Sequence, residues 1–160
     1  MRELLRTVVV AVSGSEASIK AAKYGIALAR SYNVRLIAVY VVDTATLKEL
    51  LLSRIFIEEE SAEYEKSLEQ NGQRYLNYVE ELASKKSVSV EKVLRRGTIS
   101  TEVVEVAEDA HADLILLGGF EEKSLLRDTM SRQRREIVRH ARCSVLIVKE
   151  PDVEDLYRKS

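Results

Sequence analysis

Short apolar runs rich in β-branched residues alternate with helical patterns along this chain, and that alternation constrains the fold more than any other feature. The first run, Thr7–Val12, is almost continuously apolar, which is typical of a strand buried on both faces of a parallel sheet. Similar runs cover residues 34–42, 87–94, 112–117 and 145–148. The alternation predicts an α/β fold, with a parallel sheet and helices on both of its faces.

Helical patterns fill the gaps between these runs. The apolar residues within 19–29 recur at spacings of three and four, which predicts a helix with one buried face. Ser13 and Glu16 match a capping box, so we expect this helix to start at Ser13. A turn at Gly97 precedes a further helix whose apolar face begins at Ile99.

The segment 58–86 has the composition of a long charged helix. Leucines within 43–57 suggest a short helix before it. We expect Gly72 to weaken the middle of the long helix. One apolar stripe should pack on the rest of the protein, so the helix is not a linker; its residues are Tyr64, Leu68, Tyr75, Tyr78 and Leu82.

The length of 160 residues favours one domain, which we assign to residues 1–150. Near its end, Ser131 is expected to cap a helix that runs to about Ala141, before the strand at 145–148. Residues 151–160 are expected to form a charged tail.

Composition excludes several classes of protein. A hydrophobic content of 46% is too high for a disordered chain. The 25 basic and 26 acidic residues give a net charge of −1, so we expect neither nucleic acid nor a membrane as partner. A single cysteine, Cys143, rules out an internal disulfide, and two histidines make a metal site unfavourable. The apolar run near the N-terminus is short for a signal peptide, so we expect a cytoplasmic protein.

Small residues follow two of the predicted strands. In an open parallel sheet, ligands bind beyond the carboxyl ends of the strands. The segments Ser13-Gly14-Ser15 and Gly118-Gly119 would let a ligand approach the backbone closely, and the N–H groups of the following helix suit a phosphate. Such residues also serve strand-to-helix turns in folding alone, and both interpretations stay open.

Four segments, taken in order, resemble the universal stress protein family. They are the run from Val8 to Ser18, the Gly97 turn, the strand from Ala112 to Gly118, and the stretch from Ile137 to Val148. The resemblance extends from about Thr7 to Lys149. It implies a five-stranded parallel sheet in the Rossmann-like order 3-2-1-4-5, and a homodimer formed through the last strand, Val145 to Val148.

One branch of that family binds ATP through glycine, two residues, glycine, nine residues, glycine, then serine or threonine. Here Gly118 keeps the first position, whereas the later ones hold Glu121, Ser131 and Arg132, and Ser13 replaces the branch's aspartate. Glutamate repels a triphosphate. We therefore expect no cofactor, or weak binding of ATP with magnesium. By resemblance, the binding positions are Ala11, Val12, Ser13, Val41, Gly118, Gly119, Ser131 and Arg132.

Three other patterns allow alternatives. The arginines between 127 and 142 could form a rewired phosphate site, or a solvated face that pairs with the acids of 58–69. The Ser13 turn is also similar to the loop of adenylating enzymes, although Ala17 replaces its aspartate. His140 and Cys143 have the spacing of a nucleophile and its base, but capping and packing explain them equally.

The function expected from these observations is that of a non-enzymatic universal stress protein. It would act as a cytoplasmic homodimer in the stress response, with weak or absent ATP binding and a regulatory protein as partner. The alternative is an adenine-nucleotide sensor of the same family, which would bind ATP or AMP through its arginines. An adenylating enzyme would need a catalytic acid that the motifs do not supply.

Overall fold

The computed structural model describes residues 3–119 and 127–160, with the backbone alone for residues 127–131. Its sheet has five parallel strands in the order β3-β2-β1-β4-β5. This confirms the predicted α/β fold and the order 3-2-1-4-5. The strands are β1 (Thr7–Val12), β2 (Arg35–Val42), β3 (Val90–Arg96), β4 (Leu114–Gly118) and β5 (Ser144–Val148).

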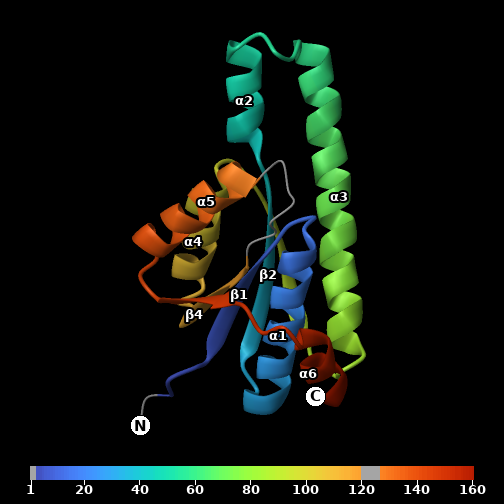
Figure 1. The fold of residues 1–160 in the computed structure, drawn as a ribbon, viewed down its shortest axis with the longest axis vertical. Helices are drawn as coiled ribbons and strands as arrows, with labels where there is room; N and C mark the ends of the chain where they lie inside the picture. The colour runs from blue at the N-terminus through green and yellow to red at the C-terminus, as the bar shows by residue number, and fades with distance from the viewer. Residues whose placement is uncertain (1–2, 120–126) are drawn as a thin grey trace.

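Helices cover both faces of the sheet (Figure 1). Helices α1 (Glu16–Tyr32), α3 (Glu58–Ser84) and α6 (Val153–Lys159) pack on one face, and α4 (Ile99–Asp109) and α5 (Arg127–His140) pack on the other. The central strand β1 is buried on both sides, since Val8 and Val10 join one core and Val9 joins the other. The continuous apolar run in β1 therefore predicted its position correctly.

Several boundaries differ from those predicted. Strand β3 begins at Val90 and continues to Arg96, so it starts three residues later and ends two residues later than the predicted run of 87–94. Helix α5 begins at Arg127, four residues before the expected cap, so Ser131 lies inside the helix. The short helix expected within 43–57 is α2 (Thr44–Leu52), and the Asp43 carboxylate caps it by accepting from Thr46 N at 3.0 Å.

The predicted stripe of α3 is confirmed in part: Leu82 is buried, and Leu68 and Tyr75 pack against the core. Tyr64 and Tyr78 are 49% and 43% exposed. The buried residues are Ser61, Gly72, Leu76, Val79, Leu82 and Ala83. Gly72 lies at the contact itself, because a β-carbon there would come within 2.5 Å of Tyr40 Cδ1. The absence of a side chain at Gly72, which was expected to weaken the helix, lets α3 approach β2 closely.

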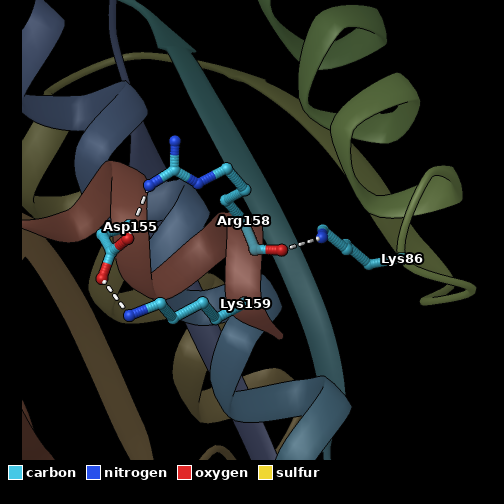
Figure 2. Close-up of polar contacts among 4 residues, drawn as sticks. All are labelled: Lys86, Asp155, Arg158 and Lys159. Carbon is cyan, nitrogen blue, oxygen red and sulfur yellow. Dashed lines mark hydrogen bonds and ion pairs between the residues drawn. The ribbon is translucent and has the colours of Figure 1, made fainter.

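The last ten residues are not a solvated tail. Residues 153–159 form α6, whose Val153 and Tyr157 are buried against α1 and α3. The Tyr157 hydroxyl donates to Leu82 O at 2.7 Å. At the end of α6, Lys86 Nζ donates to Arg158 O at 2.9 Å (Figure 2). Two apolar residues spaced by one helical turn therefore dock a segment whose composition is mostly charged.

Helices α2 and α3 form a hairpin that stands beyond the carboxyl edge of the sheet (Figure 1). Only the lower part of α3, as drawn in Figure 1, packs on the strands. Tyr64, in the second turn of α3, is therefore exposed. No helix in the described part of the chain has the length and apolar character required to cross a membrane.

Candidate functional site

The candidate site lies at the carboxyl edge of the sheet, where the strand order reverses. Strand β1 lies between β2 and β4, and Val10 pairs with Leu116 of β4. Continuing this register by two residues places Val12 beside Gly118. The turns that follow both strands are therefore neighbours, at the switch point where α/β sheets bind ligands.

Three serine side chains close the turn between β1 and α1. Ser15 Oγ accepts from Ser18 N at 3.1 Å, and Ser13 Oγ accepts from Ser15 N at 3.2 Å. Ser13 N donates to Ser18 Oγ at 3.0 Å, and that hydroxyl lies 2.7 Å from Ser13 O and 2.9 Å from Ser15 O. The backbone donors of all three serines are thus occupied by hydroxyl groups of the same turn.

The N-cap of α1 is Ser15, and the capping box predicted from Ser13 and Glu16 is wrong. Ser15 has the extended backbone of a cap (φ −81°, ψ 148°), and α1 begins at Glu16. Glu16 is instead the first helical residue, where the positive end of the helix dipole stabilises its carboxylate. Ser15 Oγ accepts from the backbone amide of Ser18, three residues on, as the side chain of an N-cap does.

Gly118 brings β4 into direct contact with the first turn of α1. A β-carbon at Gly118 would lie 2.7 Å from the carbonyl of Ala17 and 2.9 Å from Ser18 N. At Gly119, a β-carbon would lie 3.1 Å from Val148 O. Both glycines therefore have a packing role, in agreement with the folding interpretation of the small residues.

Helix α5 contributes two side chains to this edge: Arg134, one of the arginines that the sequence offered for a phosphate site, and Gln133, which sequence reasoning did not assign to it. Arg134 Nη1 donates to Gly119 O at 3.0 Å and lies 3.3 Å from Gly118 O. Gln133 Oε1 accepts from Ser100 N at 2.8 Å, so it caps the N-terminus of α4. Their partners are 15 and 33 residues away, and no local pattern could indicate them.

The predicted binding positions on the strands share one edge. Ala11 and Val12 end β1, Ser13 follows it, and Gly118 and Gly119 lie at the end of β4. Val41 is near the end of the neighbouring strand β2 and is 9% exposed. A role for these residues in binding a ligand stays a prediction.

The remaining predicted positions lie on or before α5. Arg132 is exposed on the helix. The side chain of Ser131, and Glu121 altogether, lie outside the described residues. Helix α5 begins before both Ser131 and Arg132, so neither is at its N-terminus.

The described acids of α3 that form ion pairs do so with β3, not with α5. Arg96 Nη1 lies 3.2 Å from Glu65 Oε1, and Arg96 Nη2 lies 2.7 Å from Glu69 Oε2. Just after the end of α5, Arg142 Nε lies 3.5 Å from Glu108 Oε1 of α4. The described contacts therefore do not support a basic helix face that pairs with the acids of 58–69.

Two tyrosines lie behind the β1 turn. The rings of Tyr40 and Tyr75 are stacked with their centroids 6.4 Å apart. Burial raises the pKa of the Tyr40 hydroxyl, and the neighbouring Tyr75 adds to this effect. A β-carbon at Gly14 would meet the Tyr75 ring at 3.2 Å, so the turn packs directly on this aromatic pair.

The contacts of His140 and Cys143 favour packing and capping over a nucleophile–base pair. His140 Nε2 lies 3.1 Å from Glu136 Oε2 on the exposed surface. Burial raises the pKa of the Cys143 thiol, which disfavours the nucleophilic thiolate. The thiol lines a cavity of about 300 Å³ with His111 and Arg142, at the amino edge of the sheet. Packing and capping are the roles that these contacts support.

The described residues offer no cluster of metal ligands. No three histidine, cysteine, aspartate or glutamate side chains among them converge on a point that could hold an ion. The chemical groups of the strand-end site are hydroxyls, backbone amides and one guanidinium. Such groups suit the recognition of an anion.

Comparison with known proteins gives a consistent family. The model of the universal stress protein family matches residues 5–149. Universal stress protein MJ0531 of Methanocaldococcus jannaschii is 31% identical over 158 residues, which cover 94% of this chain and 86% of that protein.

Solved structures share the fold. Universal stress protein UspA from Lactobacillus plantarum superposes with a TM-score of 0.72 at 19% identity, over 91% of this chain and 98% of that one. A family protein from Arabidopsis thaliana with AMP bound gives a TM-score of 0.65 at 15% identity, over 93% and 94% of the two chains. The family match and the relative in Methanocaldococcus show that this chain belongs to the universal stress protein family.

Proposed function

We propose that this chain is a non-enzymatic, cytoplasmic regulator of the stress response, which transmits its signal through protein contacts and binds ATP weakly or not at all. Membership of the universal stress protein family supports the stress-response role. The observation that carries the proposal is the closed state of the turn between β1 and α1.

Phosphate binds at a helix N-terminus because the backbone N–H groups there lack partners. In this turn, Ser15 N and Ser18 N already donate to serine hydroxyls, and Ser13 N donates to Ser18 Oγ. A hydrogen bond to a charged acceptor contributes about 1.5–3 kcal/mol, against about 0.5–1.5 kcal/mol for a neutral one. Replacing a serine hydroxyl by a phosphate oxygen as the acceptor therefore adds little binding free energy per donor. The entropy lost when the ligand is ordered offsets that gain.

Arg134 occupies the other side of the same edge. Its guanidinium donates to the carbonyl of Gly119 and lies within reach of that of Gly118. A phosphate at this point would compete with these two carbonyls for the Arg134 guanidinium. If the phosphate took the guanidinium, a water molecule would have to donate to the carbonyls instead. This contact supports a site held closed by the protein's own side chains.

We also propose a homodimer formed through β5. This strand is at the edge of the sheet, and its Ile147 is 37% exposed. An edge strand with free backbone groups and an exposed apolar residue is suited to pairing with a second copy. The variant Ile147→Lys should then convert a dimer to a monomer in sedimentation velocity, and an unchanged mass would contradict this part of the proposal.

The second candidate is an adenine-nucleotide sensor. The Arabidopsis relative has AMP bound, and the exposed Arg132 and half-buried Arg134 supply cations beside the strand ends. A monophosphate carries less charge than ATP and needs fewer donors, so a site reduced in this way favours AMP.

Calorimetry and thermal unfolding with ATP, AMP, cyclic AMP and pyrophosphate, each with and without magnesium, separate these functions. A ligand at a hundredfold excess over its dissociation constant stabilises the folded state by about 2.7 kcal/mol. The proposal predicts little or no stabilisation by ATP. Binding of AMP that Arg134→Ala abolishes and Arg139→Ala preserves would establish the sensor instead. If chromatography detected ADP or AMP produced from ATP in the presence of magnesium, the protein would be an enzyme that turns over ATP.

A further inference from the structure

The tip of the α2–α3 hairpin carries an unusual concentration of exposed apolar side chains. Leu52, Ile55, Ile57 and Tyr64 are 76%, 65%, 59% and 49% exposed. We call these four residues the hairpin tip. A soluble protein normally exposes such residues singly, and a group of them marks a surface that another molecule covers.

The hairpin tip has a defined conformation. The amides of Ile55 and Phe56 both donate to Leu50 O, at 3.0 and 3.2 Å, which closes the end of α2. The ring of Phe56 meets that of Tyr64 edge-on, with the centroids 5.7 Å apart. A surface that is already ordered loses little conformational entropy when it binds.

Carboxylates follow the apolar residues at the start of α3. Residues 52–66 include five acids and two basic residues. The acids at the start of α3 are exposed and form no ion pair within the described part of the chain; they are Glu58, Glu59, Glu60 and Glu63. This charge disfavours nucleic acid and anionic membranes, and it favours an apolar partner surface with basic residues around it.

The exposed face of helix α5 in the same chain is basic and carries one exposed apolar residue. Residues 132–142 include five arginines and one glutamate. Val138 is 52% exposed, and the arginines at 132, 135 and 139 are exposed on the helix around it. We call Arg135, Val138 and Arg139 the basic face. Within the described residues, neither Arg135 nor Arg139 forms an ion pair.

We propose that the hairpin tip of one copy docks on the basic face of α5 in a second copy. Each surface combines exposed apolar and charged side chains, and the charges of the two surfaces have opposite signs. The contact joins two different surfaces, so a pair keeps one free tip on one copy and one free basic face on the other. Association therefore continues into a ring or an open chain. This assembly is independent of the dimer formed through β5 and of any nucleotide.

Charge reversal on each surface tests the contact by sedimentation velocity at increasing protein concentration. The variants are E59K/E60K on the tip and R135E/R139E on the basic face, both made in the Ile147→Lys background so that pairing through β5 does not contribute. Each variant alone should lose at least about tenfold in association, because like charges then face each other. An equal mixture of the two should associate again, since each tip then meets a face of opposite charge.

Further arms separate this contact from general charge effects. The control E81K/E105K changes the net charge as much as E59K/E60K does, at exposed positions elsewhere, and should associate as the parent does. Raising salt from about 0.1 M to 1 M shortens the Debye length from about 10 Å to about 3 Å and should weaken association. A parent that stays monomeric, or a mixture that fails to associate, would overturn the proposal. Charge-reversed variants that associate as strongly as the parent would also overturn it, and would indicate that the hairpin tip binds a different protein.

Discussion

Gly118 and Ala17 are in such close contact that a β-carbon at position 118 would lie 2.7 Å from the carbonyl carbon and oxygen of Ala17. This contact seats the first turn of α1 on the end of β4. It makes Gly118 a packing residue at the same place where the ATP-binding branch of the family has its first motif glycine.

We expect Gly118→Ala to destabilise the protein by about 1–3 kcal/mol, because backbone must shift to admit the methyl group. Urea unfolding followed by circular dichroism measures the change. Gly14→Ala is the matched control. Its β-carbon would meet only the far end of the Tyr75 side chain, at 3.2 Å, and the ring can move. Equal losses in the two variants would contradict the packing role of Gly118.

Gly72→Ala sets helix propensity against packing. Alanine in the middle of a helix is favoured over glycine by about 1 kcal/mol. At Gly72, however, the methyl group would lie 2.5 Å from Tyr40 Cδ1, and that ring is buried and stacked on Tyr75. We expect packing to dominate, with a net loss of about 1–3 kcal/mol in urea unfolding.

A double-mutant cycle with Tyr40→Ala checks the cause. Removal of the ring should cancel most of the cost of Gly72→Ala and reveal the propensity gain. If Gly72→Ala cost the same without the ring, the contact with Tyr40 would not be the reason.

Tyr157→Phe should show how α6 stabilises the end of α3. The Tyr157 hydroxyl donates to Leu82 O, one of the carbonyls in the last turn of that helix. Loss of the donor leaves a buried acceptor unsatisfied, which costs about 1–3 kcal/mol. Tyr32→Phe, at an exposed position, should leave the urea midpoint unchanged. A Tyr157→Phe protein as stable as the parent would mean that water replaces the hydroxyl.

The ion pair between Arg35 and Glu91 gives a pH dependence of known sign. Hydrogen bonds from the Arg35 guanidinium hold the pKa of Glu91 below its ordinary value. The stabilisation is therefore present above the pKa of an unfolded glutamate, about 4.3, and is lost as pH falls through the lower folded value. Glu91→Gln should slightly lower the urea midpoint at pH 7 and have less effect at acid pH.

The control for this pair is Glu81→Gln, which changes an exposed glutamate. It should leave the midpoint the same at both pH values. The effect of Glu91→Gln should be small, because both side chains of the surface pair are half exposed. An effect that grew as the pH fell would contradict the assigned direction of the Glu91 pKa shift.

The patterns of single segments were enough for the architecture. The apolar runs and their alternation with helical patterns predicted a parallel sheet with helices on both faces, because a strand buried on both faces must be apolar at successive residues. The five-stranded sheet was what the family resemblance implied. The order of its strands came from the resemblance of four segments to the universal stress protein family. The same segments predicted that the ends of β1 and β4 would carry the candidate site, and the strands meet there.

Tertiary structure decided what depends on residues distant in the chain. The apolar pattern of α3 did not reveal that Gly72 faces Tyr40, nor that Val153 and Tyr157 bring a charged segment onto α1 and α3. The partners of Gln133 and Arg134 lie on α4 and at the end of β4. Local periodicity reports which face of an element avoids water. Which neighbour fills that face, and which donor satisfies a carbonyl, is set by the packing of elements that the sequence keeps far apart.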